Sequence, residues 1–572
     1  MILFHVLCLA FSVACAAENR PHIIFIMADD VGWADTSLTG SHQVPTPNLD
    51  TLAAHGILLN QHYTLQTCTP SRAALLTGLY PIRMGLQHHV MIPAQPGGMD
   101  PSVPTMAQRL KGLGYMTHAL GKWHLGYSDT EYLPMRRGFD TFYGYYNIAK
   151  YYFRQMLNHH NICGRDYWDN ETLVADKDGT YDTDLVTDRA VDIISNHDSD
   201  KPLFMYLAFL AAHGQTTNLT ADAPERNLAK FPYIEDHNRT LLAGAVDALD
   251  ESVGRIVAAL QQRHMLANSV LVFTSDNGGI PWGEYSNTGS NWPLRGTKGT
   301  MWEGGVRLPA VVWSPLLAAG SRVVIRQPMH LVDWLPTLYS AAGGLIKDLG
   351  EIDGIDLWPV LSAAKISNDT LWPRTELLMN FDTGSGLSAY RDGAYKLVRV
   401  TTPKAEEARY PFDDPGLQRN VPTPGGMPPG QGGKEATERL NTLMKSSLAW
   451  RTLQDLYGDG DTSSPKSLPS DWREQAAVLC EPQDGTIPGL EQLREGDYLF
   501  NIERDPCELE NLAPSLPSVV EKLSEKLNSY APIAKSPAKL TTDPAGLPQF
   551  HDCVWAPWEN TPQMPKRSCP CP

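Results

Sequence analysis

The sequence has few of the features that mark membrane, nucleic-acid-binding or zinc proteins. After residue 17, no stretch of its 572 residues approaches the run of about 18 apolar residues that a membrane span requires. Acidic residues outnumber basic residues by 64 to 47, and the resulting net charge of −17 disfavours a nucleic-acid partner. No Cys/His cluster favours zinc. Hydrophobic residues make up 42% of the chain, which is ample for a large core in about two or three domains.

The first 17 residues, MILFHVLCLAFSVACAA, are typical of a secretory signal peptide, although they contain no Lys or Arg. The alternative is an N-terminal membrane anchor, for which the apolar run is short. Four Asn-X-Ser/Thr sequons indicate glycosylation on the secretory route, at Asn170, Asn218, Asn238 and Asn368. We therefore expect a lysosomal or extracellular protein with no membrane span in its mature form.

Cysteine is scarce after residue 17. Seven cysteines remain there, at positions 68, 163, 480, 507, 553, 569 and 571. The secretory lumen favours disulfides, and an odd number leaves one thiol over, for which Cys68 is the candidate. The other six allow up to three disulfides with fifteen possible pairings. Cys569 and Cys571 should not pair with each other, since only one residue separates them.

Short apolar runs alternate with amphipathic helical patterns in the first two thirds of the chain. The runs read as buried strands at residues 21–30, 115–126, 201–213 and 268–279, and helix patterns cover 103–114 and 238–264. This alternation predicts an α/β fold with a large mixed, mostly parallel sheet flanked by helices. We assign residues 18–373 to this domain.

The pattern changes after about residue 374. Residues 388–399 predict a hairpin that turns across Asp392-Gly393, and residues 496–513 predict a strand followed by a turn. Residues 421–434 form a Pro/Gly-rich loop or linker. We assign residues 374–572 to a smaller C-terminal α+β domain that contains an antiparallel sheet and ends in a cysteine-containing tail.

Each of the four apolar runs ends in polar groups. They are Asp29 and Asp30, then Lys122 and His124, then His213, and finally Asp276 with Asn277. Ligands of open α/β sheets bind beyond the carboxyl ends of the strands, so these groups meet in one cleft if the runs are parallel neighbours. The Asp and Asn side chains supply only oxygen ligands, which suit Ca²⁺ or Mg²⁺. The alternative is that each pair forms a strand-to-loop turn.

Cationic groups accompany these oxygen ligands. Lys298 lies in a Gly- and Trp-rich segment at 291–307, and Arg72 follows Cys68 by four residues. Together with Lys122, His124 and His213, they would suit a tetrahedral oxyanion such as sulfate or phosphate beside a metal. Taken singly, each could instead be a solvated surface charge or a structural histidine.

Cys68 lies in the stretch LQTCTPSRAALLTG, residues 65–78. The pattern predicts a helix that starts at Thr69, with Pro70 near its first position and Gly78 at its end. Cys68 would then lie at a helix N-terminus, where the dipole favours an anion. Close to Arg72, such a thiol should have a lowered pKa, which suggests a nucleophile at an anion site.

These segments resemble the sulfatase family. The motifs that carry the resemblance are CTPSRAALLTG (68–78), GKWHLG (121–126), MADDVGW (27–33), TSDNGG (274–279), RGTKGTMWEGGVR (295–307) and LFNIERDPCELENLA (499–513). Within the family, the segments NWPLRG, WEGGVR and DWLPTL are most similar to the arylsulfatase B group. After His213 the sequence runs GQTTN, where relatives usually have a proline-containing segment, and this loop faces substrate in the family.

The resemblance implies a specific chemistry for Cys68. A formylglycine-generating enzyme would oxidise it to Cα-formylglycine, whose hydrated diol is the nucleophile. The metal ligands would be Asp29, Asp30, Cys68, Asp276 and Asn277, with Ca²⁺ as the ion. The diol attacks sulfur to form a covalent sulfo-enzyme, and its second hydroxyl then expels sulfate.

The same resemblance assigns the cationic residues. Arg72 would steady the diol, and Lys122, His213 and Lys298 would hold the sulfate oxygens. His213 or Lys298 would protonate the leaving group, and His124 would be the base for sulfate release. We therefore expect a sulfuric ester hydrolase that acts on a sulfated carbohydrate or aryl sulfate, such as N-acetylgalactosamine 4-sulfate in glycosaminoglycans. The alternatives are a phospho- or phosphonate ester hydrolase on the same scaffold and a non-catalytic secreted glycan-binding protein.

Overall fold

The structure is a computed structural model. It describes residues 20–215, 220–281, 286–317, 324–363, 371–401, 433–457, 471–480, 495–539 and 541–571. The expected signal peptide, the sequons at Asn218 and Asn368 and nearly all of the Pro/Gly-rich segment 421–434 lie outside these residues. None of the described helices is both long enough and apolar enough to cross a membrane.

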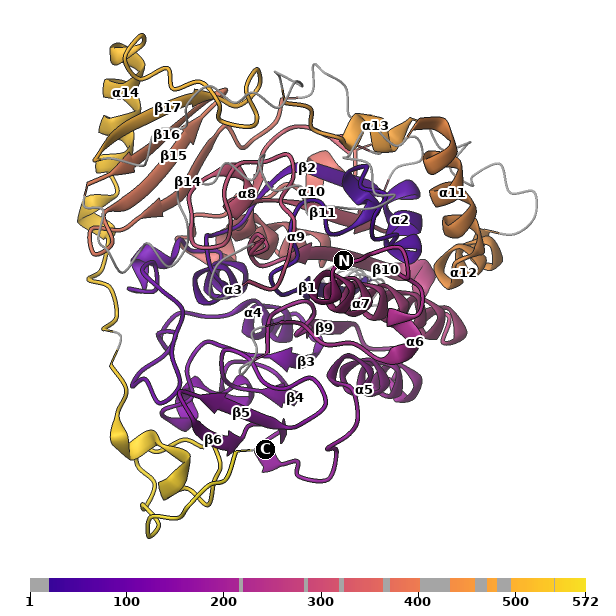
Figure 1. The fold of residues 1–572 in the computed structure, drawn as a ribbon, viewed down its shortest axis with the longest axis vertical. Helices are drawn as coiled ribbons and strands as arrows, with labels where there is room; N and C mark the ends of the chain where they lie inside the picture. The colour runs from indigo at the N-terminus through magenta and orange to yellow at the C-terminus, as the bar shows by residue number, and fades with distance from the viewer. Residues whose placement is uncertain are drawn as a thin grey trace, which may run out of the picture.

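A large mixed sheet organises the first two thirds of the chain (Figure 1). Its centre is five parallel strands in the order β10-β1-β9-β3-β4: Ser269–Ser275, His22–Ala28, Leu203–Ala208, Met116–Lys122 and Thr141–Tyr145. The four predicted apolar runs are four of these strands, and all are direct neighbours. The prediction of a mostly parallel sheet is confirmed.

Shorter or reversed strands complete the two edges of this sheet. On one side, β11 (Arg307–Trp313) is antiparallel to both β10 and β2 (Ile57–Tyr63), and β12 (Val324–Ile325) and β13 (Met329–His330) pair with β2. On the other side, β7 (Trp168–Asp169) and β8 (Thr172–Leu173) follow β4. A separate hairpin is formed by β5 (Met156–His159) and β6 (Ile162–Arg165).

Helices cover both faces of the sheet, and this explains the unbroken apolar runs. Alternate residues of β1 point to opposite faces, and all of them are buried. One face packs on α3 (Cys68–Thr77), α4 (Met106–Gly112), α9 (Trp334–Ala341) and α10 (Trp358–Leu361). The other face packs on α2 (Pro47–Ala54), α5 (Asp182–Asn196), α6 (Glu225–Leu228) and α7 (His237–Gln262). The helices predicted at 103–114 and 238–264 are α4 and α7.

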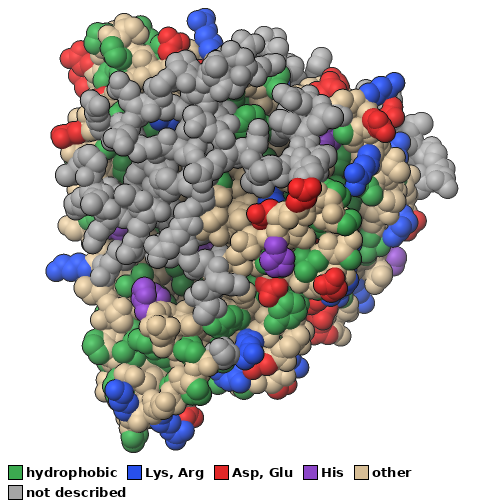
Figure 2. Space-filling model, in the orientation of Figure 1, with side chains coloured by type: hydrophobic (Ala, Val, Ile, Leu, Met, Phe, Trp, Pro, Cys, Tyr) green, Lys and Arg blue, Asp and Glu red, His purple; other side chains and the backbone are tan. Residues whose placement is uncertain are grey.

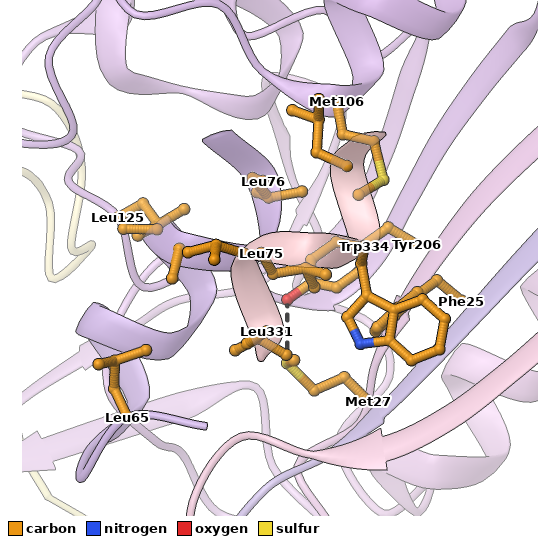
Figure 3. Close-up of a cluster of buried hydrophobic side chains, with 14 of the residues drawn as sticks. Phe25, Met27, Leu65, Leu75, Leu76, Met106, Leu125, Tyr206, Leu331 and Trp334 are labelled. Carbon is orange, nitrogen blue, oxygen red and sulfur yellow. Dashed lines mark hydrogen bonds between the residues drawn. The ribbon is translucent and has the colours of Figure 1, made fainter. Parts of the chain in front are cut away.

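The first of these layers fixes helix α3 on the sheet. Phe25 and Met27 of β1 lie against Leu75 of α3 and Trp334 of α9, all with fully buried side chains (Figure 3). The rings of Phe25 and Trp334 meet edge to face at 5.6 Å. The rigid packing of α3 holds the residue at its N-terminus, Cys68, in one place.

A smaller antiparallel sheet lies beside the large one. It consists of β14 (Glu376–Phe381), β15 (Leu387–Asp392), β16 (Tyr395–Val400) and β17 (Gly496–Asn501), with α14 (Pro517–Asn528) packed on it. The predicted hairpin is confirmed, but its two-residue loop is Gly393-Ala394. Asp392 still pairs with Tyr395, so it belongs to the strand and not to the turn.

Other C-terminal segments return to the large sheet. Helices α11 (Gly433–Ser446), α12 (Leu448–Tyr457) and α13 (Trp472–Ala476) pack beside α2 and α7, and the last residues run back to β5 and β6 (Figure 1). The boundary at residue 374 stays a prediction. Figure 2 shows acidic and basic side chains interspersed on the described part of one face.

Among the described residues, three disulfides join the six cysteines other than Cys68. They are Cys163–Cys571, Cys480–Cys507 and Cys553–Cys569. Cys68 is the one free cysteine among the described residues, and it is buried. The expected odd thiol and the absence of a Cys569–Cys571 pair are both confirmed.

Candidate active site

The polar ends of the central strands meet at one edge of the large sheet. Asp29 and Asp30 directly follow β1, Lys122 is the last residue of β3, and Asp276 and Asn277 directly follow β10. Helix α3 brings Cys68 to the same place. The structure therefore brings together residues that are up to 248 positions apart, as the strand-end pattern predicts.

Cys68 is the first residue of α3, and Thr67 precedes the helix in an extended conformation. The helix thus begins one residue earlier than the predicted start at Thr69, while Gly78 ends it in the left-handed region as expected. The thiol donates to Asp29 Oδ1 at 3.5 Å and is fully buried.

The predicted lowering of the Cys68 pKa is wrong. Burial and the Asp276 carboxylate raise the pKa of this thiol far above its ordinary value, and Lys122 and Lys298 oppose them only in part. The sequence pattern could not show this burial. It also could not show that the Arg72 guanidinium donates to Asp276 at 2.7 Å and lies 3.7 Å from Asp29.

Each carboxylate of the site has its own cation. Lys122 Nζ lies 2.6 Å from Asp29 Oδ2, and Lys298 Nζ lies 2.7 Å from Asp30 Oδ1. Burial raises the pKa of Asp29 and of Asp30, but these lysines, with His213, outweigh it and lower both pKa values. Both carboxyl groups therefore favour the ionised form, and each is paired with a buried lysine.

The described residues contain a group with the geometry to hold a metal ion. Ligand atoms of Asp29, Asp30, Cys68 and His213 all lie within 4.8 Å of one another. Asn277 Oδ1 is buried there without a hydrogen-bond partner, while its Nδ2 donates to Asp30 at 2.7 Å. A buried acceptor without a partner beside two carboxylates fits a hard cation. These residues therefore form a possible metal-binding site.

Two members of the predicted set differ in their surroundings. Asp276, expected as a ligand, accepts from Arg72 and from the Asp30 N–H at 3.2 Å and lies outside that group of four. His213, expected to hold sulfate and to be one of two candidate acids, belongs to it, with Nε2 at 3.6 Å from Asp30 Oδ2. Sequence spacing could not separate these cases, because both residues follow strands of the same sheet.

The two histidines are held by backbone groups. His124 Nε2 lies 2.8 Å from Met91 O, and its buried Nδ1 has no hydrogen-bond partner in the described residues. Burial, with Lys122 next in effect, lowers the pKa of His124 well below its ordinary value. His213 Nδ1 lies 2.6 Å from Gly214 O, and burial lowers its pKa although Asp30 opposes this. Both rings therefore favour the neutral form.

Several supporting residues have no signal in the sequence. Asn287 Nδ2 donates to Asp30 O at 3.0 Å and to Ala212 O at 2.9 Å, which ties the two strand-end loops together. Tyr152 donates from its hydroxyl to His213 O at 2.9 Å. Their partners lie 61 to 257 residues away, so no local motif could have found them.

Fold and site together define an α/β protein that carries a buried carboxylate cluster and two lysines at the edge of its large sheet, with Cys68 at the start of helix α3. The Sulfatase family model matches residues 21–344. The chain belongs to the sulfatase family and is an enzyme of that class.

Its relatives extend the likeness to most of the chain. It is 33% identical to arylsulfatase J of Mus musculus over 562 residues, covering 97% of this chain and 83% of the relative. It is 32% identical to N-acetylgalactosamine-6-sulfatase of Mus musculus over 403 residues, covering 67% and 73%. Among solved structures, Ps i-CgsB in complex with k-i-k-neocarrahexaose has a TM-score of 0.66 at 24% identity, covering 92% of this chain and 96% of that one, which shows the shared fold. Family and relatives support sulfuric ester hydrolysis.

Proposed function

We propose that this sulfatase releases inorganic sulfate from a sulfated carbohydrate or aryl sulfate through a formylglycine made from Cys68. The carrying observation is the position of Cys68. It is the free cysteine of the described residues, it begins helix α3, and its thiol contacts Asp29, which is paired with the buried Lys122. The CTPSR sequence around it is intact, which favours sulfate over phosphate or phosphonate esters.

The nucleophile would be one oxygen of the hydrated aldehyde. After loss of its proton to solvent, this oxygen would form a bond to sulfur while the ester S–O bond breaks, and the leaving oxygen would take a proton from the Lys298 ammonium or from His213 in its protonated form. His124 then removes the proton of the second hydroxyl, the carbonyl re-forms, and the bond to sulfate breaks. The neutral His124 ring with an unpaired Nδ1 supports this role as a base.

The remaining residues would bind and orient. Lys122, His213 and Lys298 would hold the sulfate oxygens, since each lies at the rim of the carboxylate cluster. Arg72 would steady the diol. Asp29, Asp30, Asp276, Asn277 and residue 68 would hold the metal. A bound Ca²⁺ would supply positive charge that stabilises a deprotonated oxygen nearby.

The substrate class follows from the relatives. One of them is named N-acetylgalactosamine-6-sulfatase, and a solved structure of the same fold holds k-i-k-neocarrahexaose. We infer a sulfated sugar, with N-acetylgalactosamine 4-sulfate as the specific candidate from the likeness to the arylsulfatase B group. A lysosomal or extracellular location fits this substrate. Asn238 is exposed and Asn170 is half-buried, so Asn238 is the better placed of the two described sequons.

Mass spectrometry and a substrate panel test this proposal. The peptide that contains residue 68 should carry an aldehyde in protein made with the formylglycine-generating enzyme, and an unmodified thiol in fully active protein would overturn the mechanism. The purified protein should hydrolyse sulfated sugars, while Cys68→Ala should not. Cleavage of phosphate esters alone would instead support the phosphohydrolase alternative.

A further inference from the structure

A short loop, residues 87–91, runs along the edge of the candidate active site. Gln66 Nε2 donates to Gln87 O at 2.9 Å, and Gln66 O accepts from the Gly299 N–H at 2.7 Å. Gln66 lies two residues before Cys68, and Gly299 directly follows Lys298. The start of the loop is therefore tied to both segments that carry these site residues.

The end of the same loop is tied to the site as well. The Met91 N–H donates to Thr69 Oγ1 at 3.0 Å, and Met91 O lies 2.8 Å from His124 Nε2. Thr69 follows Cys68 directly. The loop is therefore held at both ends beside residues of the candidate site, next to the nucleophile position and to the candidate base.

His88 lies inside this loop, and its ring is fixed. Nδ1 is 2.6 Å from Asp382 Oδ2, while the His88 side chain is 21% exposed and that of Asp382 is fully buried. Asp382 is itself held by Ser385 Oγ at 2.5 Å and by the Gly384 N–H at 2.8 Å. Because Asp382 is buried and held by these two hydrogen bonds, its carboxylate is fixed and orients the His88 imidazole.

The second ring nitrogen is left for a ligand. Within the described part of the chain, the side chain of His88 has one hydrogen-bonding partner, Asp382, and its ring also lies against that of His89 at 4.0 Å. With Nδ1–H directed at the carboxylate, Nε2 can accept from a hydroxyl, and once protonated it can donate to an oxygen. A sugar offers hydroxyl groups of this kind, whereas a simple aryl sulfate offers none.

We propose that His88 is a specificity-determining residue that hydrogen-bonds the sugar bearing the sulfate ester, and that Asp382 is the positioning residue that orients it. This inference rests on the proposed function, because it names what holds the substrate beyond its sulfate group. Gly384 fits the same picture, since a Cβ at this position would lie 3.2 Å from the His88 ring and press on it.

Two substrates separate this role from a structural one. We would measure kcat and KM of wild type, His88→Ala and Asp382→Asn on N-acetylgalactosamine 4-sulfate and on a sugar-free aryl sulfate. The ratio of kcat/KM for the sugar to that for the aryl sulfate should fall about tenfold in both variants, mainly through KM, as expected for one lost hydrogen bond to an oriented polar group. His264→Gln, a substitution of an exposed histidine, is the matched control.

The double variant tests the link between the two residues. If Asp382 acts through the histidine, adding Asp382→Asn to His88→Ala should not lower the ratio of the two kcat/KM values any further. An unchanged ratio, or an equal loss on both substrates, would overturn the inference. Turnover of the aryl sulfate by wild type tests the proposed function separately.

Binding gives a readout that needs no turnover. Calorimetry of N-acetylgalactosamine 4-sulfate with Cys68→Ala should show a Kd about tenfold lower than with the Cys68→Ala, His88→Ala protein. Equal Kd values would overturn the role of His88 whether or not the enzyme proves to be a sulfatase toward this sugar.

Discussion

Replacing Glu508 by glutamine should change how the stability of the protein depends on pH. Glu508 and Glu303 approach the Lys396 ammonium at 2.8 and 2.9 Å, and all three side chains are fully buried where the small sheet meets the large one. Burial raises the pKa of Glu508 to about 7, although Lys396 opposes it. Burial also acts on Glu303, but Lys396 and two arginines outweigh it and lower its pKa, so Glu303 is the ionised partner.

The direction in which stability changes with pH follows from how many protons the folded and unfolded states bind. Folded Glu508 keeps its proton up to about pH 7, whereas the unfolded chain releases it near pH 4.5. The folded state thus binds more protons in this window, and the Glu508 contribution to the free energy of unfolding falls as pH rises through it. Between about pH 5 and about pH 8, these two pKa values give a loss of roughly 2.5 kcal/mol.

Urea denaturation followed by tryptophan fluorescence at these two pH values measures the effect. Glutamine keeps the side-chain length and an oxygen for the Glu303 N–H, which lies 2.7 Å from Glu508 Oε2, but it cannot ionise. The free energy of unfolding of wild type, compared with that of Glu508→Gln, should therefore fall by roughly 2.5 kcal/mol between the lower and the higher pH. Glu376→Gln is the control, because its pKa is lowered and it stays ionised across the range. Parallel pH curves for wild type and Glu508→Gln would refute the reasoning.

Three further predictions concern the core and the site. Leu75→Ala should lower the free energy of unfolding by about 2–5 kcal/mol in urea titrations, because its fully buried side chain packs α3 on the sheet, and a loss below about 1 kcal/mol would contradict this packing. Lys122→Met should reduce kcat/KM for sulfate esters at least about 100-fold by removing the cation 2.6 Å from Asp29, so nearly normal turnover by a folded variant would dismiss its role. Dialysis against EDTA should lower activity and the Tm, with recovery on adding Ca²⁺, since a bound ion stabilises only the folded site. An identical Tm with and without Ca²⁺ would argue against the metal.

The central strands could be predicted because both of their faces are buried. A strand such as β1 then contains only apolar residues, and its polar ends mark the sheet edge where the site forms. Strand β2 carries no such signal. Its Asn60, Gln61 and His62 are buried, and two of them have distant hydrogen-bond partners, Arg307 for Asn60 and Trp334 for His62. Such pairs across more than 200 residues also set the antiparallel register of β11, and no local pattern contains them.

The same limit explains why the sequence placed Cys68 correctly but not its electrostatics. Helix-start residues around position 68 act locally, so the pattern predicted α3 to within one residue. The charge at the thiol depends on Asp29 and on Asp276, which takes the Arg72 guanidinium from 204 residues away. A buried thiol whose pKa is raised is a poor nucleophile, because only the thiolate attacks. Without a bound metal ion, the surroundings of Cys68 thus disfavour its thiolate, and the proposed conversion of this residue to an oxygen nucleophile does not depend on that thiolate.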